Sequence, residues 1–263
     1  MCGRSGGAGH TETGAVLGPA TFKRRDKPSD PDPDEIFTLW RETGRGFYAT
    51  NGAVLGIIKR SSPRKETDAP DLFIFGLPLD FRGYKVGYSE EAASHDDRFT
   101  WAVLKGHTDN RSGYVKLKSN SAFDTPEINF KYFEESSQEH ANDLQSVVDG
   151  VEFVREIYKR LENDGVIAEQ LSPKADEDLH AFVKNNAWGH LASCTCKIGP
   201  DKDTDAILDK DFQVRGAKNL RVVDASVFPR IPGLFILSAV YMISEKASDV
   251  IIDKYRQALQ SGG

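Results

Sequence analysis

The sequence NAWGHLASCTCKIG (residues 186–199) precedes NLRVVDASVFPRIPG (219–233) and LFILSAVYMISEKA (234–247). The apolar run Leu220–Asp224 predicts a short strand, and the prolines and glycine that follow it predict a loop. Apolar residues then recur at spacings of three and four, which predicts an amphipathic helix whose inner face carries Val240, Ile243, Ala247, Val250 and Ile251. A strand, a tight loop and the start of a helix can hold a polar or negatively charged ligand, because free backbone N–H groups point out of the helix.

Composition sets the class of protein. The chain has 263 residues, of which 39% are hydrophobic and 28% are charged, enough for one large or two small globular domains. The net charge of −6 argues against general nucleic-acid binding, and no apolar run reaches the roughly 20 residues of a membrane helix. Cys194 and Cys196 are too close together for the usual zinc pair, so we expect no metal site. The polar start and the three cysteines indicate a cytoplasmic protein.

The middle of the chain changes from strand patterns to helix patterns. Four segments with apolar residues bounded by turn residues predict strands: Asp71–Leu79, Phe99–Lys105, Tyr114–Lys118 and Glu127–Phe133. Asn142–Leu161 shows a 3.6-residue period, with Asn142 as its expected N-cap, and Asp176–Val183 predicts a shorter helix. Strands followed by helices indicate an α+β fold, with an antiparallel sheet and helices on one face.

Three domains are expected along the chain. Residues 1–35 are polar, Gly-rich and Pro-rich, which predicts a flexible tail. The glycines near the start do not complete a dinucleotide-binding loop, because no apolar strand precedes them and the G-x-G-x-x-G pattern is not finished. Residues 36–185 should form the antiparallel sheet with its helices, and residues 186–263 should form a separate C-terminal segment.

The quoted motifs together closely resemble the C-terminal part of the glucose–methanol–choline (GMC) flavoprotein oxidoreductases. The resemblance extends back to about Trp40 through GFYATNGAVLGIIKRS, PDLFIFGLPLDFRGY, LKGHTDNRSGYVKLKS and TPEINFKYFEE, in the order of that family. It implies a substrate domain at 36–185 and the closing part of an incomplete Rossmann-like FAD domain at 186–263. It also implies FAD as cofactor, a small-molecule alcohol as substrate, and hydride transfer from its CH–OH group to the flavin.

The resemblance assigns roles to particular positions. The family's active-site histidine falls at Leu191, and its second active-site position falls at Phe235, so neither residue here can accept a proton. His190, one residue out of register, is either a replacement base or a hydrogen-bonded structural histidine. Asp224 and Ala225 match positions beside the FAD pyrophosphate. Ile236 and Leu237 match positions next to the isoalloxazine ring.

The Gly-rich loop that begins the family's flavin-binding half has no counterpart in this sequence. We therefore expect that the chain alone does not retain FAD and is inactive by itself. Two alternatives stay open beside the enzyme interpretation. One is a non-catalytic remnant or interaction module, and the other is one subunit of a split enzyme, whose partner chain carries the N-terminal FAD-binding half.

Overall fold

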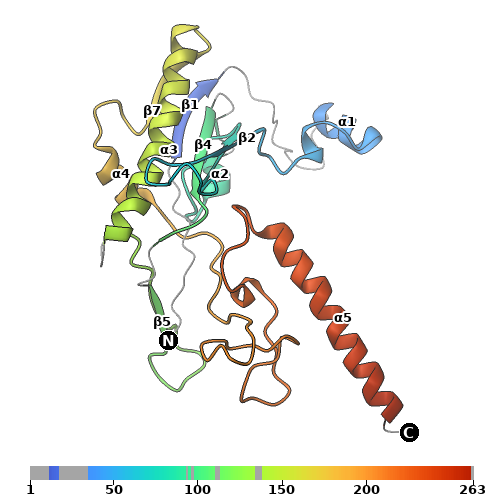
Figure 1. Cartoon of the computed structure of the whole chain (residues 1–263). Coiled ribbons are helices and arrows are strands. Elements are labelled where there is room, and N and C mark those ends of the chain that lie inside the picture. The colour runs from blue at the N-terminus through green and yellow to red at the C-terminus, as the bar shows by residue number, and fades with distance from the viewer. Residues whose placement is uncertain are drawn as a thin grey trace. The chain divides into compact units, whose positions relative to one another are not determined.

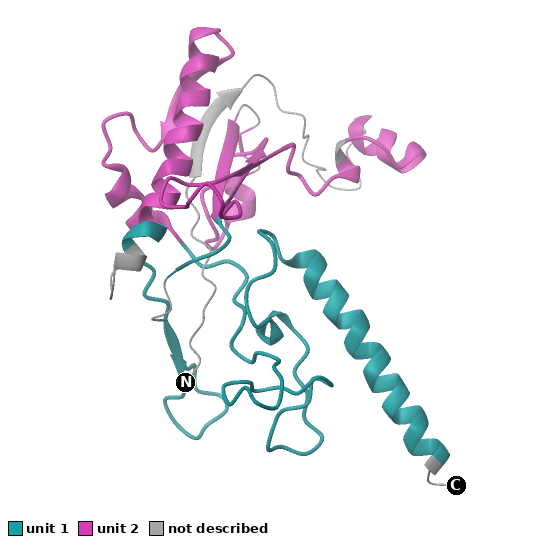
Figure 2. Ribbon diagram, in the orientation of Figure 1, with its two compact units in different colours: residues 1–9, 105–143, 188–263 teal, residues 10–104, 144–187 magenta. Residues whose placement is uncertain are grey.

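The computed structural model describes residues 12–17, 35–92, 94–95, 98–109, 113–133 and 138–261. Apart from Glu12–Leu17 and Glu35, the expected tail at 1–35 lies outside these residues. The chain divides into two compact units built from interleaved segments (Figure 2). Unit 1 contains residues 1–9, 105–143 and 188–263, and unit 2 contains 10–104 and 144–187. These units do not coincide with the expected ranges 36–185 and 186–263, because residues 105–143 are grouped with the C-terminal segment.

Unit 2 is organised around a five-stranded sheet. The strands, in spatial order, are β2 (Leu55–Lys59), β3 (Leu72–Leu77), β4 (Arg98–Lys105), β1 (Glu12–Leu17) and β7 (Ile167–Ser172). β1 pairs antiparallel with both β4 and β7, and β2 pairs antiparallel with β3. The strands expected at Asp71–Leu79 and Phe99–Lys105 are confirmed as β3 and β4. The expected flexible tail is wrong for Glu12–Leu17, because backbone pairing on both sides holds this segment in the sheet.

The long helix α3 (Gln138–Asn163) runs along this sheet (Figure 1). Its inner face is fully or almost fully buried and consists of Leu144, Val147, Val148, Val151, Val154 and Tyr158. A β-carbon at Gly150 would lie 2.5 Å from Val103 Cγ1 of β4, so glycine lets the helix backbone approach the strand. The α+β class, with a helix packed on a sheet, is confirmed.

Helix starts differ from the sequence expectation. α3 begins at Gln138, so Asn142 lies inside the helix and is not its N-cap. The expected helix at Asp176–Val183 is α4 (Leu179–Asn186), because the Asp178 side chain accepts hydrogen bonds from the backbone N–H groups of His180 and Ala181. Three short helical segments complete this unit: α1 (Glu35–Thr43), η1 (Phe47–Ala49) and α2 (Tyr88–Ala92).

Unit 1 has little regular structure before its last helix. β5 (Tyr114–Lys116) and β6 (Glu127–Asn129) pair antiparallel, which confirms the two strands expected there, although both are shorter. η2 (Ala225–Val227) is one turn long, and α5 (Leu237–Ser261) ends the unit. On α5, Ala247 is buried and Val240, Ile243 and Val250 are partly buried, as predicted, whereas Ile251 is 43% exposed.

The strand expected at Leu220–Asp224 does not form. Its one ladder contact is an isolated bridge between Arg221 and Gln213. The backbone bonds locally instead: Val214 N–H donates to the Leu220 carbonyl and Val222 N–H donates to the Phe212 carbonyl. Apolar side chains of this run still become partly buried against a cluster of Leu208, Phe212, Val227 and Ala247. Burial therefore does not require a strand here.

Candidate functional site

Two of the signature segments lie side by side in unit 1. The N–H groups of Cys194, Cys196 and Ile198 donate to the carbonyl oxygens of Ala225, Ser226 and Val227, at 3.2, 2.9 and 2.9 Å. Alternate residues of one segment thus bond successive residues of the other. This backbone ladder places the segment of Cys194 and Cys196 against the one-turn helix η2.

Asp224 caps this one-turn helix. Its carboxylate accepts a hydrogen bond from the Ser226 N–H at 2.7 Å, and its carbonyl accepts one from the Val227 N–H at 3.2 Å. The side chain is exposed, so the negative charge faces solvent. A carboxylate offers no donor to a phosphate group, so any contact of Asp224 with a pyrophosphate has to come from its neighbouring backbone.

An apolar cluster brings together three of the residues singled out from the sequence. Its buried members are Cys194, Phe228 and Ile236, and Leu191 and Ala225 pack against them. The remaining members are Ile231, Ala239, Val240 and Ile243. Leu191 has a φ of +64°, a conformation that L-residues other than Gly, Asn and Asp rarely adopt. Leu191 is therefore held in a strained backbone conformation while its side chain contributes to packing.

Phe235 and Leu237 are not members of this cluster. They are 43% and 51% exposed, whereas Ile236 between them is 2% exposed. The first α5 backbone bond runs from Val240 N–H to the Ile236 carbonyl, at 3.0 Å, and the first turn has no acidic residue. Exposed apolar side chains at the positive end of a helix fit one edge of an aromatic ring that carries polar atoms, such as a flavin. The described residues contain no Gly-rich loop for the phosphates of such a cofactor.

His190 is half-buried, and this burial lowers the pKa of its imidazole below the ordinary 6.5. The ring is therefore neutral at physiological pH and keeps one nitrogen lone pair. A neutral imidazole can accept a proton, and it can equally serve as a structural hydrogen-bonding group. His190 and Leu191 are adjacent in the chain but have different surroundings, because Leu191 packs against the apolar cluster and His190 is not a member of it.

Two close approaches next to these positions escaped the sequence analysis. A β-carbon at Gly189 would overlap the hydroxyl oxygen of Tyr132. A β-carbon at Gly106, just after β4, would lie 2.5 Å from Leu234 Cδ2 and 3.2 Å from Leu234 Cα. Each glycine thus allows a distant segment to press on a loop of the candidate site. The glycines themselves were visible in the sequence, but their partners were not.

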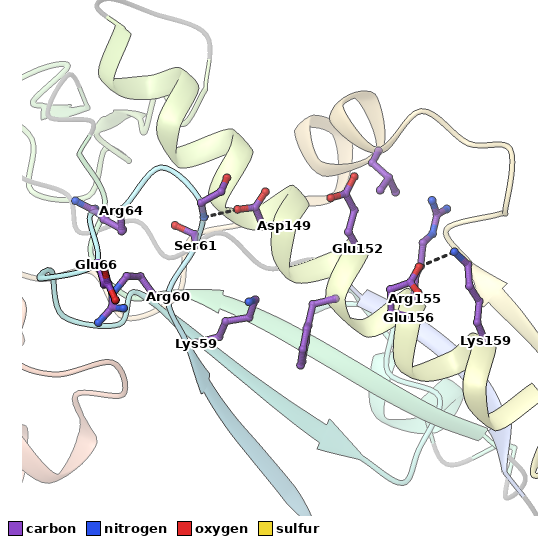
Figure 3. Close-up of a pocket in the computed structure, with 13 residues that line it drawn as sticks. Lys59, Arg60, Ser61, Arg64, Glu66, Asp149, Glu152, Arg155, Glu156 and Lys159 are labelled. Atoms are coloured by element: carbon purple, nitrogen blue, oxygen red, sulfur yellow. Dashed lines mark hydrogen bonds and ion pairs between the residues drawn. The ribbon is translucent and has the colours of Figure 1, made fainter.

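A separate groove lies in unit 2, with a volume of about 810 Å³ (Figure 3). None of the residues predicted for the site lines it. Two hydrogen bonds lie along it: the backbone N–H of Ser62 donates to Asp149 Oδ2 at 2.6 Å, and Lys159 Nζ donates to Glu156 Oε1 at 2.6 Å. Lys59 lies over the Phe153 ring, 5.0 Å from its centroid. The first of these contacts ties the loop after β2 to α3, which is a structural role.

Within the described ranges, no group of three or more His, Cys, Asp or Glu side chains could hold a metal ion. None of the helices that the structure describes combines the length and the apolar character needed to cross a membrane.

Several known proteins are similar to this chain in sequence or in fold. Oxygen-dependent choline dehydrogenase of Vibrio vulnificus (strain YJ016) is 33% identical over 224 residues, which cover 83% of this chain and 38% of that protein. The enzyme of the same name from Photobacterium profundum is 36% identical over 222 residues, which cover 82% and 37%. Among solved structures, formate oxidase of Aspergillus oryzae RIB40 matches with a TM-score of 0.72 and 18% identity, over 97% of this chain and 48% of that one.

The chain therefore spans less than half the length of the relatives it matches. Because its sequence identity is low, the similarity to formate oxidase shows a shared fold and nothing further. The family model of GMC oxidoreductase matches residues 109–244, just over half of the chain, and includes every position of the candidate site. The chain belongs to the GMC oxidoreductases and represents a C-terminal portion of that fold.

Proposed function

We propose that these residues form the substrate-side, C-terminal portion of an FAD-dependent oxidoreductase acting on the CH–OH group of a small alcohol. The observation that carries this proposal is the convergence of the three signature segments around the cluster of Leu191, Ala225 and Ile236, beside the start of α5. The names of the relatives, choline dehydrogenases, support an alcohol as substrate. When bound, FAD would supply the redox chemistry, and Ile236 and Leu237 would lie next to its isoalloxazine ring.

We infer further that this chain does not complete the reaction by itself. Removing the proton of an alcohol requires a group with a lone pair within hydrogen-bond reach. Leu191 and Phe235 stand at the two positions where the GMC motif places such groups, and neither has a lone pair. His190 is neutral and next in sequence, but Leu191 packs into the apolar cluster and the two adjacent side chains do not share one environment.

FAD retention is the second requirement that the chain does not meet. Binding of a pyrophosphate relies on several backbone N–H groups from a Gly-rich loop at a helix start. The sequence offers no completed loop of this kind, and Asp224 turns an acceptor toward its own backbone. The missing half is then supplied by a partner chain or by further residues of a longer polypeptide.

The retention proposal is tested by incubating the purified 263-residue chain with FAD, desalting it and recording the flavin absorption band. Full-length Vibrio vulnificus choline dehydrogenase, treated in the same way, is the positive control. We expect no retained flavin in the chain. Stoichiometric retained flavin would show a complete site and would overturn this part of the proposal.

The role of Leu191 is tested in the same relative. The residue of the Vibrio vulnificus enzyme that aligns with Leu191 is replaced by leucine, and anaerobic flavin reduction by choline is followed. General base catalysis contributes typically 10²–10⁴-fold, so we expect a loss of about that size. Unchanged reduction would show that leucine is compatible with turnover at this position.

A non-catalytic interaction module is the second candidate function. The observation that favours it is the number of large apolar side chains left exposed in unit 1, such as Leu117 at 86% and Phe123 at 98%. An assembled, flavin-loaded complex distinguishes the two functions. Reduction of its flavin by a panel of primary and secondary alcohols supports the enzyme, and no reduction by any of them supports the module.

A further inference from the structure

Tyr132 lies directly against the backbone of Gly189, the residue before His190. A β-carbon built at position 189 would overlap the Tyr132 hydroxyl oxygen and lie 3.3 Å from Cζ and 3.8 Å from Cε1 of the same ring. Both residues belong to unit 1. Any side chain at position 189 therefore has to displace the tyrosine ring, and the contact requires glycine.

The Tyr132 ring is held in this place by its own neighbours. Phe130 stacks on it with ring centroids 5.3 Å apart and an interplanar angle of 17°, and the buried Phe133 lies 6.1 Å away in a tilted arrangement. Between them Lys131 adopts a φ of +48°, and its N–H donates to Asn129 Oδ1 at 3.0 Å. This turn after β6 sets the direction of Tyr132. A strained backbone conformation such as that of Lys131 persists where the surrounding contacts hold it in place.

The other side of His190 is fixed as well. Leu191 packs against Cys194, Phe228 and Ile236, and Cys194 is bonded through its N–H to the Ala225 carbonyl. On one side of His190, Gly189 thus lies against Tyr132, and on the other side Leu191 packs against the apolar cluster. Because both neighbours are held in place, the backbone of His190 has little freedom.

We propose that Tyr132 is a positioning residue that, through the backbone of Gly189, determines where the His190 imidazole lies in the site. The proposal rests on the proposed function only in that His190 belongs to the substrate side of the site. The contact acts by shape. Burial raises the pKa of Tyr132 to about 12, so its hydroxyl stays protonated at physiological pH and is not a proton acceptor.

The test is an NMR titration of the 263-residue chain with ¹³C-labelled histidine and tyrosine rings, which requires neither FAD nor turnover. In the parent chain, His190 should titrate below 6.5 and Tyr132 above 10.0, because both rings are partly buried. In Gly189→Ala, we expect the pKa of His190 to rise toward 6.5 and the pKa of Tyr132 to fall toward 10.0, since the added methyl group separates ring and backbone. General loosening of the fold would move both pKa values in the same way, so the free energy of unfolding is measured in parallel by urea denaturation, and positioning predicts these shifts in a variant that keeps the parent stability.

Two substitutions at Tyr132 keep the test decisive if Gly189→Ala fails to fold. Tyr132→Phe removes the hydroxyl oxygen, the atom nearest to Gly189, and should raise the pKa of His190 in part, whereas Tyr132→Ala removes the whole ring and should raise it further. Tyr255→Ala is the matched control, because Tyr255 is a tyrosine of the same unit that is 69% exposed near the end of α5. It should not change the titration of His190.

An unchanged His190 titration in both Gly189→Ala and Tyr132→Ala would overturn the proposal. A shift of His190 in Tyr255→Ala as large as that in Tyr132→Ala would also overturn it, because the loss of a tyrosine elsewhere in unit 1 would then have the same effect. Since neither result depends on flavin, they separate this proposal from the failure of the enzyme function.

Discussion

Leu191 packs into the apolar cluster that contains the buried Ile236, whereas Phe235, directly before Ile236 in the chain, leaves 43% of its surface exposed. The two positions that we propose as counterparts of the family's polar active-site groups are thus both apolar here but differ in environment. Leu191 is partly buried against the cluster, whereas Phe235 lies at the surface of unit 1. Substitutions at the two positions should therefore have different consequences.

Leu191→His should destabilise the chain. An imidazole placed among Cys194, Phe228 and Ile236 loses apolar contact and buries a polar group, which costs about 1–3 kcal/mol. The free energy of unfolding from urea denaturation measures the loss. Phe235→His is the matched control, since exposed substitutions usually stay within about 0.5 kcal/mol. Equal stability of the two variants would show that the Leu191 pocket accommodates a histidine.

His190 should make stability depend on pH in the acidic range. Its folded-state pKa is lowered by burial, so the unfolded chain takes up the proton first as the pH falls. Well above pH 6.5 the ring is neutral in both states, so His190 does not make stability depend on pH there. As the pH falls from 6.5 toward the lower folded-state pKa, the free energy of unfolding decreases. Urea denaturation at a series of pH values tests this.

In His190→Gln this part of the pH dependence should disappear. His180→Gln, which removes an exposed imidazole on α4, is measured in parallel as the control for loss of a histidine. A His190→Gln curve with the same acid slope as the parent would contradict the prediction and would mean that burial does not perturb this ring.

Gly150→Ala should destabilise unit 2 although alanine is the better helix former. The added methyl group would lie 2.5 Å from Val103 Cγ1 and 3.6 Å from Leu72 Cδ1, both of them buried side chains. Overpacking of this kind costs about 1–3 kcal/mol, against about 1 kcal/mol gained in helix propensity. We expect a net loss in urea denaturation, while Glu152→Ala on the exposed side of α3 should be nearly neutral. A more stable Gly150→Ala variant would show that the helix can move away from the strand.

The end of α5 should promote self-association. Ile252, Tyr255 and Leu259 follow one another at spacings of three and four and are 46%, 69% and 66% exposed, so they form one apolar stripe on the helix surface. The double variant Tyr255→Glu, Leu259→Glu should lower the average mass measured by light scattering at high protein concentration. Lys254→Glu changes a neighbouring charge outside the stripe and should not. A parent chain that is monomeric throughout the concentration range would refute this prediction.

Local patterns carried much of the information about this protein. The period of three and four over Asn142–Leu161 predicted α3, and the alternating or apolar runs predicted β3, β4, β5 and β6, because side-chain periodicity follows directly from backbone geometry. The resemblance of the signature motifs also indicated the GMC family, which the known relatives confirm, whereas the roles of Leu191, Phe235 and Asp224 stay predictions. These features depend on residues close together in the chain.

Other features depend on contacts between distant residues. Asn142 has the chemistry of an N-cap, yet α3 begins four residues earlier. Leu220–Asp224 has the composition of a strand, but its backbone groups bond within the neighbouring loop, because pairing depends on which segment lies alongside.

Sequence motifs identified His190 and Leu191 as neighbours, and folding assigned them different roles. The apolar cluster takes the Leu191 side chain, and the Tyr132 ring presses on Gly189 beside His190. Composition and spacing place these residues in one segment. Their burial, the pKa of the imidazole and the need for glycine at position 189 arise from packing against residues far away in the chain, which no local pattern encodes.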